Sequence, residues 1–383
     1  MEKQQPVEFH APKAWLTGLS VHDFRNYDDC RITIGASNIL LLGENGAGKT
    51  NLMEAVSLLA PGRGLRRARA EHLPREGSGD QWAVSASLET ADGTVKIGSG
   101  VPAGADTGRR VMRLDGETVA QAEIGRLFSV SWLTPRMDGI FVDSPGARRR
   151  FLDRLVIAFD PAHIGRTNRY DKLLRERATL LGEGRIDDAW FGAIESSLAE
   201  SAIAVTAARQ ALIADLNAEA MDGWFGFPGA QLALDGTVES WLAEGSALEA
   251  EDRFIAAARS RREAGDTALA GPHASDMTAR NSQTGGAAHL ASTGQQKAIL
   301  IAVVLAHARL QSRRLARPPI LLLDDVVAHL DQARRQALFD AVGAVGGQAW
   351  FSGTDRDDFE GLSAQTMAIC AEDGLARITQ SED

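Results

Sequence analysis

The chain has 383 residues, 44% of them hydrophobic and 24% charged, which is enough for a large core and predicts about two or three domains. Its net charge of −10 argues against a polycation that coats nucleic acid, but not against local basic patches, because the field at a phosphate depends on nearby charges. Cys30 and Cys370 lack metal-ligand spacing, and no signal sequence or membrane-spanning apolar run is visible. We therefore expect a reduced, cytoplasmic protein without membrane attachment.

The first predicted elements lead into a glycine-rich loop. Residues 14–42 alternate like strands and end in the short apolar run 39–42, which is typical of a buried parallel strand. Residues 51–59 carry apolar side chains at helical spacing and stop before Pro61. Between them lies a full match to the phosphate-binding pattern G-x-x-x-x-G-K-[ST], made of Gly43, Glu44, Asn45, Gly46, Ala47, Gly48, Lys49 and Thr50.

A strand, a glycine-rich loop and a helix form the context that this motif requires. The glycines let the backbone turn its N–H groups inward, and the helix N-terminus favours an anionic phosphate. Lys49 would reach the β- and γ-phosphates of a nucleotide, and the Thr50 hydroxyl would bind Mg²⁺. The alternative, a glycine turn that matches by chance, is disfavoured by the eight matched positions.

An antiparallel sheet is predicted downstream of the loop. Its segments are residues 85–88, 94–97 and 111–114, with turns at Asp92-Gly93 and Asp115-Gly116. Residues 98–108 are predicted to form a glycine-rich loop, and residues 128–133 another buried strand.

The middle of the chain is predicted to be mainly helical. Residues 148–221 are rich in Ala, Leu and Arg, with breaks at Pro161 and at 182–184. Residues 238–263 are helical again, a strand is expected at 225–234, and a loop is expected over 264–290.

These patterns divide the chain into three parts. An N-terminal ATPase part (1–147) and a C-terminal ATPase part (264–383) bracket a helical lobe (148–263). Two antiparallel helices drawn from that lobe would reach about 60–80 Å at 1.5 Å per residue. Chromosome-condensing proteins of this architecture would need an insertion several times longer.

The C-terminal part contains a candidate second half of the nucleotide site. Residues 320–323 form an apolar run that ends in Asp324 and Asp325, between predicted helices at 294–310 and 332–343 and before a short strand at 349–351. Asp324 would hold Mg²⁺ through water, and Asp325 could orient the attacking water. A plain turn or helix cap is the alternative, which is disfavoured because a phosphate-binding loop requires an acidic strand.

A polar segment precedes the acidic strand, and we call residues 292–297 the signature segment. Its Ser292, Gly294 and Gln295 lie at the start of a predicted helix, where backbone donors point out of the helix end. Alone, the segment could equally be an ordinary N-cap. Its position between the phosphate loop and the acidic strand favours a contact with a nucleotide.

The order of phosphate loop, signature segment and acidic strand resembles that of ABC-type ATPases, and further stretches resemble the RecF family of bacterial recombination and replication-repair proteins. The matching stretches are residues 24–27, 43–50, 62–66, 143–153, 271–273, 292–297 and 322–331. The resemblance spans nearly the whole chain. It implies an α/β fold, in which an ABC-type P-loop ATPase head of a parallel and an antiparallel sheet carries an inserted, mainly helical lobe. It also implies that Arg25 and Asn26 take part in nucleotide binding.

The resemblance further implies a function. ATP with Mg²⁺ would drive two copies into a homodimer on double-stranded, single-stranded or gapped DNA, with the signature segment of one copy capping the nucleotide of the other. Slow, weakly DNA-stimulated hydrolysis would release the dimer. Such a protein would act in DNA-damage repair, the SOS response and replication-fork maintenance, with RecR and RecO as partners that direct RecA onto gaps.

Two positions depart from the family pattern. Arg136 follows Thr134-Pro135 at a place where a Gln or an acidic residue is expected to sense the γ-phosphate or Mg²⁺. Ala274 follows Gly-Pro-His, where an Arg is usual. The switch position, normally a His in ABC ATPases, would be Ser352 or Thr354.

Other functions share these motifs. A transporter's nucleotide-binding subunit would have a much shorter helical insertion. Another SMC-like clamp could bind ATP without turnover, since Asp325 has a shorter reach than the commoner Glu. A small-molecule kinase is disfavoured by the signature segment.

Four arginine clusters are candidates for contacts with DNA phosphates. For each cluster, a solvated or salt-bridged helix face is the favoured alternative. The clusters are Arg63/Arg66/Arg67/Arg69, Arg148/Arg149/Arg150/Arg154, Arg259/Arg261/Arg262 and Arg313/Arg314/Arg317.

Overall fold

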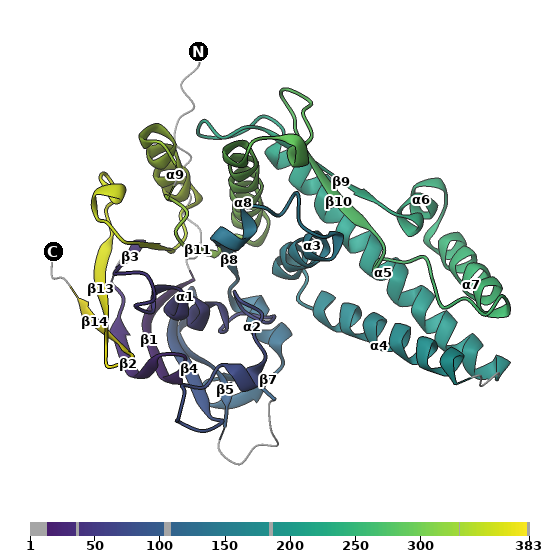
Figure 1. The fold of residues 1–383 in the computed structure, drawn as a ribbon, viewed down its shortest axis with the longest axis horizontal. Coiled ribbons are helices and arrows are strands. Elements are labelled where there is room, and N and C mark those ends of the chain that lie inside the picture. The colour runs from purple at the N-terminus through teal and green to yellow at the C-terminus, as the bar shows by residue number, and fades with distance from the viewer. Residues whose placement is uncertain (1–13, 36–37, 103–108, 184–186, 329, 381–383) are drawn as a thin grey trace. The chain divides into compact units, whose positions relative to one another are not determined.

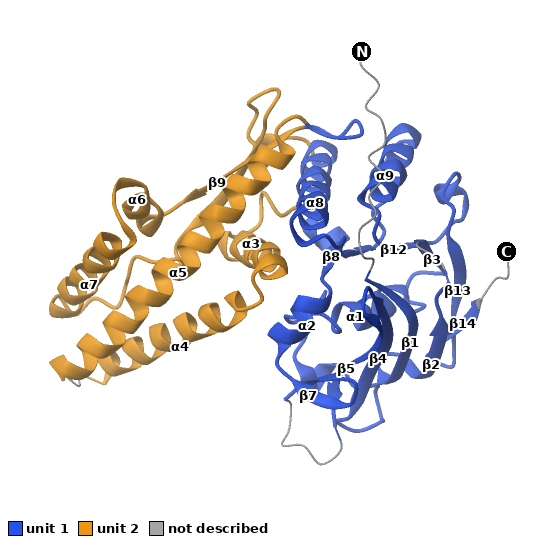
Figure 2. Cartoon of the chain, turned by 180° about the vertical axis from the view of Figure 1, so that it is seen from behind, with its two compact units in different colours: residues 1–138, 223–228, 293–383 blue, residues 139–222, 229–292 orange. Residues whose placement is uncertain are grey.

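A computed structural model of the chain describes residues 14–35, 38–102, 109–183, 187–328 and 330–380. The chain divides into two compact units, shown in blue and orange in Figure 2. Unit 1 comprises residues 1–138, 223–228 and 293–383, and unit 2 comprises residues 139–222 and 229–292. In the part of the chain that is described, no helix has the length and hydrophobicity needed to cross a membrane.

The first sheet of unit 1 is antiparallel, with strand order β2-β1-β4-β5-β6-β7 (Figure 1). Its strands are β1 (Trp15–Phe24), β2 (Tyr27–Thr33), β4 (Trp82–Thr90), β5 (Gly93–Val101), β6 (Val111–Leu114) and β7 (Glu117–Val119). Buried and exposed residues alternate along β4, as expected when one face of a sheet packs on the core. The predicted strands at 85–88, 94–97 and 111–114 are confirmed.

The glycine-rich loop predicted at 98–108 is partly wrong, because β5 continues to Val101. Gly100 pairs with Ala83, and a Cβ at Gly100 would lie 2.4 Å from the carbonyl oxygen of Trp82. The glycine therefore marks a close approach of two strands rather than a turn. Residues 103–108 of the predicted loop lie outside the described residues.

The second sheet of unit 1 has strand order β14-β13-β3-β12-β11-β8. Its strands are β3 (Asn38–Leu42), β8 (Val130–Leu133), β11 (Ile320–Leu323), β12 (Ala349–Gly353), β13 (Gln365–Glu372) and β14 (Leu375–Gln380). All neighbouring pairs are parallel except β13 with β14. Every residue of β8, β11 and β12 is buried, as is usual for a parallel sheet covered on both faces.

The described residues of unit 1 form four α-helices: α1 (Lys49–Ser57), α2 (Gln121–Leu127), α8 (Thr293–Leu315) and α9 (Gln332–Val345). The helix α1 packs against β1 of the first sheet and β12 of the second, so it lies in the core that the two sheets share. Asp331 caps α9 by accepting from the backbone N–H of Arg334, and Gly346 ends it in the left-handed conformation. The helices predicted at 51–59, 294–310 and 332–343 are confirmed, with ends that differ by a few residues.

Unit 2 is built on one long helix. Its elements are α3 (Pro145–Phe159), α4 (His163–Gly182), α5 (Asp188–Ala220), β9 (Ala230–Asp235), α6 (Thr237–Glu244), α7 (Ala247–Glu263) and β10 (Asp276–Asn281). The helix α5 packs against α3, α4, α6, α7 and β9. Its 33 residues span about 50 Å, which is shorter than the roughly 60–80 Å predicted for the lobe.

The loop predicted over residues 264–290 is wrong for its centre, because β10 pairs antiparallel with β9. Side chains of Met277 and Ala279 are buried on one face of this two-stranded sheet. The pairing places residues 264–292 in unit 2, and residues 139–147 belong to it as well. The boundaries of unit 2 thus differ from the predicted division at 147/148 and 263/264, because strand pairing across a long separation leaves little local signal.

Candidate nucleotide site

The glycine-rich loop connects β3 to α1 and has the backbone conformation that its glycines permit. Gly46 has φ 85° and Gly48 has φ 123°, values that residues with a Cβ rarely adopt. A Cβ at Gly43 would lie 2.1 Å from the carbonyl oxygen of Ile369. The loop therefore depends on glycine at these positions for its turn and for its approach to β13.

Lys49 lies over the loop with its ammonium group held by backbone oxygens. Its Nζ donates to the carbonyls of Gly43 at 2.6 Å and Glu44 at 2.9 Å. Burial lowers the pKa of Lys49, and the carboxylates of Asp325 and Asp324 act in the opposite direction. A buried cation between a helix N-terminus and two carboxylates is suited to hold phosphoryl oxygens.

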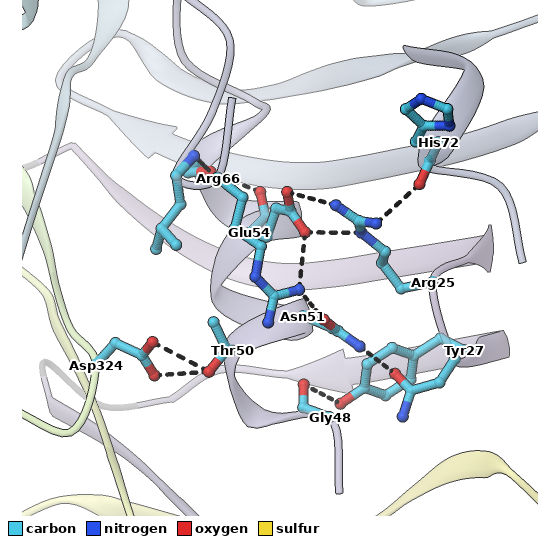
Figure 3. A network of polar contacts seen from close by, with 12 residues as sticks. Arg25, Tyr27, Gly48, Thr50, Asn51, Glu54, Arg66, His72 and Asp324 are labelled. Atoms are coloured by element: carbon cyan, nitrogen blue, oxygen red, sulfur yellow. Dashed lines mark hydrogen bonds and ion pairs between the residues drawn. The ribbon is translucent and has the colours of Figure 1, made fainter. Parts of the chain in front are cut away.

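The loop and the acidic strand meet directly, although their residues are far apart in the sequence. The Thr50 hydroxyl lies 3.0 Å from each carboxylate oxygen of Asp324 (Figure 3). Asp324 is 4% exposed, and its second partner is the Ser352 hydroxyl, which donates at 2.8 Å. Burial raises the pKa of Asp324, and the neighbouring charge of Asp325 adds to this, while the hydrogen bonds from Ser352 and Thr50 lower it.

These oxygen donors fit Mg²⁺. That ion is usually bound by one or two carboxylates together with hydroxyl, water and phosphate oxygens rather than by a cage of protein ligands. Thr50 and Asp324 supply one hydroxyl and one carboxylate at the end of β11. Among the described residues there is no cluster of three or more His, Cys, Asp or Glu side chains that could hold a metal ion without a nucleotide.

Ser352 links Asp324 to Asp325. Its hydroxyl donates to Asp324 and accepts from the backbone N–H of Asp325 at 3.0 Å. Asp325 has φ 48°, in the left-handed region, so this hydrogen bond helps to hold an unfavourable backbone conformation. Of the two predicted switch positions, Ser352 is the one in contact with the acidic pair, and Thr354 is exposed.

A second set of polar contacts supports the loop from the side of β1 and β2 (Figure 3). Asn26 donates to the carbonyl of Ala47 at 3.2 Å and accepts from Asn51 at 2.7 Å. Tyr27 donates to the carbonyl of Gly48 at 3.2 Å, and burial raises the pKa of its hydroxyl, which therefore stays protonated. A Cβ at Gly48 would lie 3.0 Å from that hydroxyl, so the tyrosine and the glycine fit each other.

Arg25 contacts α1 rather than the loop. Its guanidinium donates to both oxygens of Glu54, at 2.9 and 3.0 Å, and to the carbonyl of His72 at 2.8 Å. Glu54 is 1% exposed, and Arg66 also donates to it at 3.4 Å and to Asn51. Its charge is thus compensated by two arginines, as a buried carboxylate requires.

Sequence reasoning missed Tyr27, Asn51 and Glu54 as supports of the loop. The available signal was the acidic residue in the otherwise apolar run 52–56, because a buried carboxylate needs a cationic partner. The sequence does not say which arginine provides it, since Arg25 and Arg66 lie 29 and 12 residues away from Glu54.

Comparison with known proteins places the chain in a family. Residues 15–351 match the family described as RecF/RecN/SMC N terminal domain. A protein of Mesorhizobium japonicum named DNA replication and repair protein RecF is 41% identical over 98% of this chain and 99% of its own length. A protein of Rhizobium meliloti with the same name is 42% identical over 94% of this chain and 98% of its own length. The chain belongs to the RecF family.

Solved structures show the same fold. The recombination mediator protein RecF of the RecFOR pathway, solved as RecF-ATPrS, superposes with a TM-score of 0.82 at 21% identity, covering 96% of this chain and 99% of its own. An Smc head bound to the C-winged helix domain of ScpA gives a TM-score of 0.55 at 15% identity, covering 96% and 98%. The predicted ABC-type head with its inserted helical lobe is therefore confirmed.

The family's signature segment begins helix α8. Ser292, Gly294 and Gln295 are all exposed, with Gly294 and Gln295 in the first turn of the helix. Lys297 anchors the segment, because its Nζ donates to the carbonyl of Ala328 at 3.0 Å and lies 3.4 Å from the carboxylate of Asp138.

The two departures from the RecF pattern lie in different surroundings. Arg136 is exposed on a short 3₁₀ turn (Pro135–Met137), and the acidic residue of this segment is Asp138, two positions later. Ala274 is exposed, and its N–H donates to the carbonyl of Gly271 at 2.9 Å. A substitution at Ala274 thus falls on the surface of unit 2, beside a turn that the backbone itself closes.

The Gly-Pro-His stretch of residues 271–273 contacts two helices of unit 2, through Tyr170 of α4 and Arg209 of α5. The ring nitrogen Nδ1 of His273 lies 2.6 Å from the Tyr170 hydroxyl, and Arg209 donates to the carbonyl of Pro272 at 2.6 Å. A Cβ at Gly271 would lie 2.2 Å from the Tyr170 hydroxyl. The stretch is therefore shaped by packing inside this unit.

Several arginines of the candidate DNA clusters already bind groups within their own unit. Arg148 donates to both oxygens of Asp276 at 2.7 Å, and Arg149 donates to the carbonyl of Ser275 at 2.7 Å. Further pairs of this kind are Arg259 with Glu263, Arg261 with Asp266, Arg262 with Asp188, and Arg317 with the carbonyls of Gly125 and Arg126. Arg63, Arg66, Arg67 and Arg69 are all exposed on the segment after α1, where Arg66 also donates to Glu54 and Asn51, and Arg69 to Glu71.

Proposed function

We propose that this chain is an ATP-dependent DNA-binding protein of recombinational repair and replication-fork maintenance. The contact between the Thr50 hydroxyl and the Asp324 carboxylate carries the proposal, because it joins the phosphate loop to the acidic strand in one site. The relatives named DNA replication and repair protein RecF and the solved structure of RecF-ATP support it.

Each residue of the site has a role in binding or turnover of ATP. The loop N–H groups of residues 43–50 and the α1 N-terminus would hold the phosphates, with Lys49 at the β- and γ-phosphates. Thr50 and Asp324 would hold Mg²⁺, which would supply charge neutralisation for the phosphates. Asp325 orients the attacking water, and Asn26 fixes the loop through the carbonyl of Ala47.

The signature segment would act on a second copy of the chain. Ser292, Gly294 and Gln295 are exposed at a helix N-terminus, where backbone donors favour a phosphate. ATP held by one copy would then be capped by the segment of the other, so that binding forms a homodimer and slow hydrolysis releases it. Arg25 takes part indirectly, since its ion pair with Glu54 holds α1.

DNA binding completes the proposed cycle. The exposed arginines of residues 63–69 supply phosphate contacts on a chain whose overall charge is −10. The substrate would be double-stranded, single-stranded or gapped DNA in the cytoplasm, with weak stimulation of ATP hydrolysis. RecR and RecO would be the partners that direct RecA onto gaps, in line with the RecFOR pathway named for the solved RecF.

ATP-dependent dimerisation and DNA-stimulated phosphate release, measured on the same preparations, test this function. We expect ATP to convert monomers to dimers in light scattering and to strengthen DNA binding that weakens steeply with salt. Ser292→Arg should block dimerisation while leaving ATP affinity intact, and Lys49→Arg should impair hydrolysis. An oligomeric state independent of ATP, together with salt-independent DNA binding, would contradict the proposal.

A further inference from the structure

A short aromatic turn in residues 223–228 has a backbone that its sequence does not favour. Trp224 and Phe227 exchange backbone hydrogen bonds at 3.2 and 2.9 Å, which closes a two-residue turn over Phe225 and Gly226. Both central residues have positive φ, 46° for Phe225 and 78° for Gly226, which is the type I′ conformation. Asn, Asp or Gly is preferred at the first of these positions, so a phenylalanine there is strained.

Burial does not offset this strain. The Phe225 side chain is 41% exposed, whereas Phe227 on the other side of the turn is 4% exposed and belongs to the core. A large apolar ring that is both exposed and held in a left-handed backbone conformation indicates a role at the surface.

The turn lies against a basic stretch of α8. The Arg309 guanidinium lies over the Trp224 ring at 4.5 Å from its centre, and the Phe225 ring meets Trp224 edge-on with 4.8 Å between centres. Arg313 lies one helical turn beyond Arg309, and both Arg313 and Arg314 are exposed. A partly exposed aromatic side chain and several guanidinium groups therefore occur together on unit 1.

We propose that this aromatic turn is a stacking site for a base of single-stranded DNA, with Arg313 and Arg314 contacting the adjacent backbone phosphates. Single-stranded nucleic acid is bound by this combination, because every nucleotide has a base whose flat face stacks on a ring and a phosphate that pairs with arginine. In a duplex the base faces are covered by their neighbours, so the site selects unpaired DNA. The assignment rests on the proposed function in DNA repair and adds to it a site for the single-stranded part of a gap.

Phe225→Asn is the decisive variant, because Asn-Gly is the preferred type I′ pair. We expect its melting temperature to equal or exceed that of the unchanged protein, while its affinity for fluorescent oligo-dT falls about tenfold, the effect of losing one base stack. Affinity for an abasic oligomer of the same length and for a duplex should not change. Phe225→Gly should behave in the same way, and Trp190→Ala, which removes another exposed ring, in unit 2, should leave all three affinities unchanged.

The phosphate contact of Arg313 is tested by the salt dependence of DNA affinity. Arg313→Gln should weaken oligo-dT and the abasic oligomer equally and reduce the slope of log affinity against log salt by about 0.7, the value for one phosphate of a single strand.

These measurements distinguish a failure of the stacking site from a failure of DNA binding as a whole. If the unchanged protein binds oligo-dT no better than the abasic oligomer, or if Phe225→Asn and Phe225→Gly bind oligo-dT normally, the stacking site is wrong, and a protein partner becomes the better occupant of the turn. If the unchanged protein binds neither duplex nor oligo-dT with ATP present, the proposed function fails as well.

Discussion

Asp324 in unit 1 and Asp153 in unit 2 are two largely buried carboxylates, and their surroundings shift their pKa values in opposite directions. The partners of Asp324 are the hydroxyls of Thr50 and Ser352, and its neighbour Asp325 is another carboxylate. Burial, together with that neighbour, raises its pKa. The protein therefore disfavours the anion at the position where it would hold Mg²⁺.

Asp153 has an arginine and a histidine as partners instead. Arg209 donates to its two oxygens at 2.8 and 2.9 Å, and His163 lies 2.8 Å from one of them. Burial alone would raise the pKa of Asp153, but the hydrogen bonds from His163 and Arg209 more than offset it, and the pKa is lowered. Since Arg209 also binds the carbonyl of Pro272, this carboxylate joins α3, α5 and the Gly-Pro-His stretch.

Asp153 is thus paired with a cation inside its own unit, whereas Asp324 is surrounded by hydroxyls and a second carboxylate, which suits the proposed Mg²⁺ site. The contacts of Asp153 stabilise unit 2 and involve no exposed group of the nucleotide site. The hydroxyl partners of Asp324 do not compensate its charge at the position proposed to bind Mg²⁺, as is common in functional sites.

The largest expected effect is that of Asp324→Asn on turnover. Removing the carboxylate that we propose to hold Mg²⁺ should lower ATP hydrolysis about 100-fold or more. The melting temperature should stay the same or rise, because the repulsion from Asp325 is removed. Phosphate release and calorimetry check both parts, with Asp340→Asn on the exposed face of α9 as the matched control. A large loss of stability in Asp324→Asn would show that the Asp324 carboxylate stabilises the fold, as that of Asp153 does, and would contradict this prediction.

Asp153→Asn should lower stability and leave nucleotide binding unchanged, the reverse of what we expect for Asp324→Asn. The change leaves Arg209 buried without its anionic partner, so we expect the free energy of unfolding to fall by about 3 kcal/mol. ATP affinity of the folded protein should be unchanged. Urea unfolding and nucleotide titration are the measurements, and Asp252→Asn at an exposed position of α7 is the control. A protein that loses ATP binding but keeps its stability would show that the site extends to Asp153.

The two aspartates should also give opposite dependences of stability on pH. The lowered pKa of Asp153 means that its contribution is present above the unfolded value near 3.9 and is lost as the pH falls through the folded value. The raised pKa of Asp324 means that stability is lost as the pH rises through its folded value, so the gain in Asp324→Asn should appear only above about pH 4. Unfolding curves from pH 3 to 8 test this, and parallel curves for the two variants would contradict it.

Asn26→Ala should have a smaller effect. The change removes the hydrogen bond to the carbonyl of Ala47 and the partner of Asn51, so a looser loop should bind ATP about tenfold more weakly. Asn38→Ala, which removes an exposed hydrogen bond to the carbonyl of Ser363, is the control. Equal ATP affinity in both variants would show that Asn26 does not support the loop.

The smallest effect is expected for Arg259→Ala. Its partner Glu263 is one helical turn away on the surface of α7, and such pairs contribute about 0.5 kcal/mol or less. We expect DNA affinity and its salt dependence to stay the same, whereas Arg63→Ala in the exposed cluster of unit 1 should reduce the salt slope by about 0.9 for duplex DNA. A lowered DNA affinity in Arg259→Ala would place unit 2 in contact with DNA.

The sequence was sufficient for the parts of the site that are local. Residues 43–50 are recognisable as a loop between a strand and a helix, and the run ending in Asp324 is recognisable as a strand that ends in a carboxylate. Each pattern lies within a few residues of sequence. The sequence assigned Thr50 and Asp324 separately to Mg²⁺, and the structure places the Thr50 hydroxyl 3.0 Å from the Asp324 carboxylate oxygens.

The remaining parts depend on contacts between distant residues. Two such contacts are the pairing of Arg25 with Glu54 and the hydrogen bond from Ser352 to Asp324. Each joins separate elements, and positions in the sequence do not indicate which of the many arginines or serines is the partner. The strand β10 was missed because its neighbours are rich in Gly, Ala and Ser, and its partner β9 lies on the other side of two helices. The strained turn at Phe225 was missed since phenylalanine is unfavourable there.

The order of strands in the second sheet constrains how the protein is made. The strand β12 lies between β3 and β11 and pairs with both, so the edge of the sheet that carries the loop and the acidic pair requires residues 349–353. The ribosome reaches β12 about 300 residues after the loop, which takes about 15–60 s at bacterial elongation rates. Unit 2, enclosed in the chain between residues 139 and 292, can fold during that interval. A nascent chain can therefore form its helical lobe before the strand that joins the loop to the acidic pair has been made.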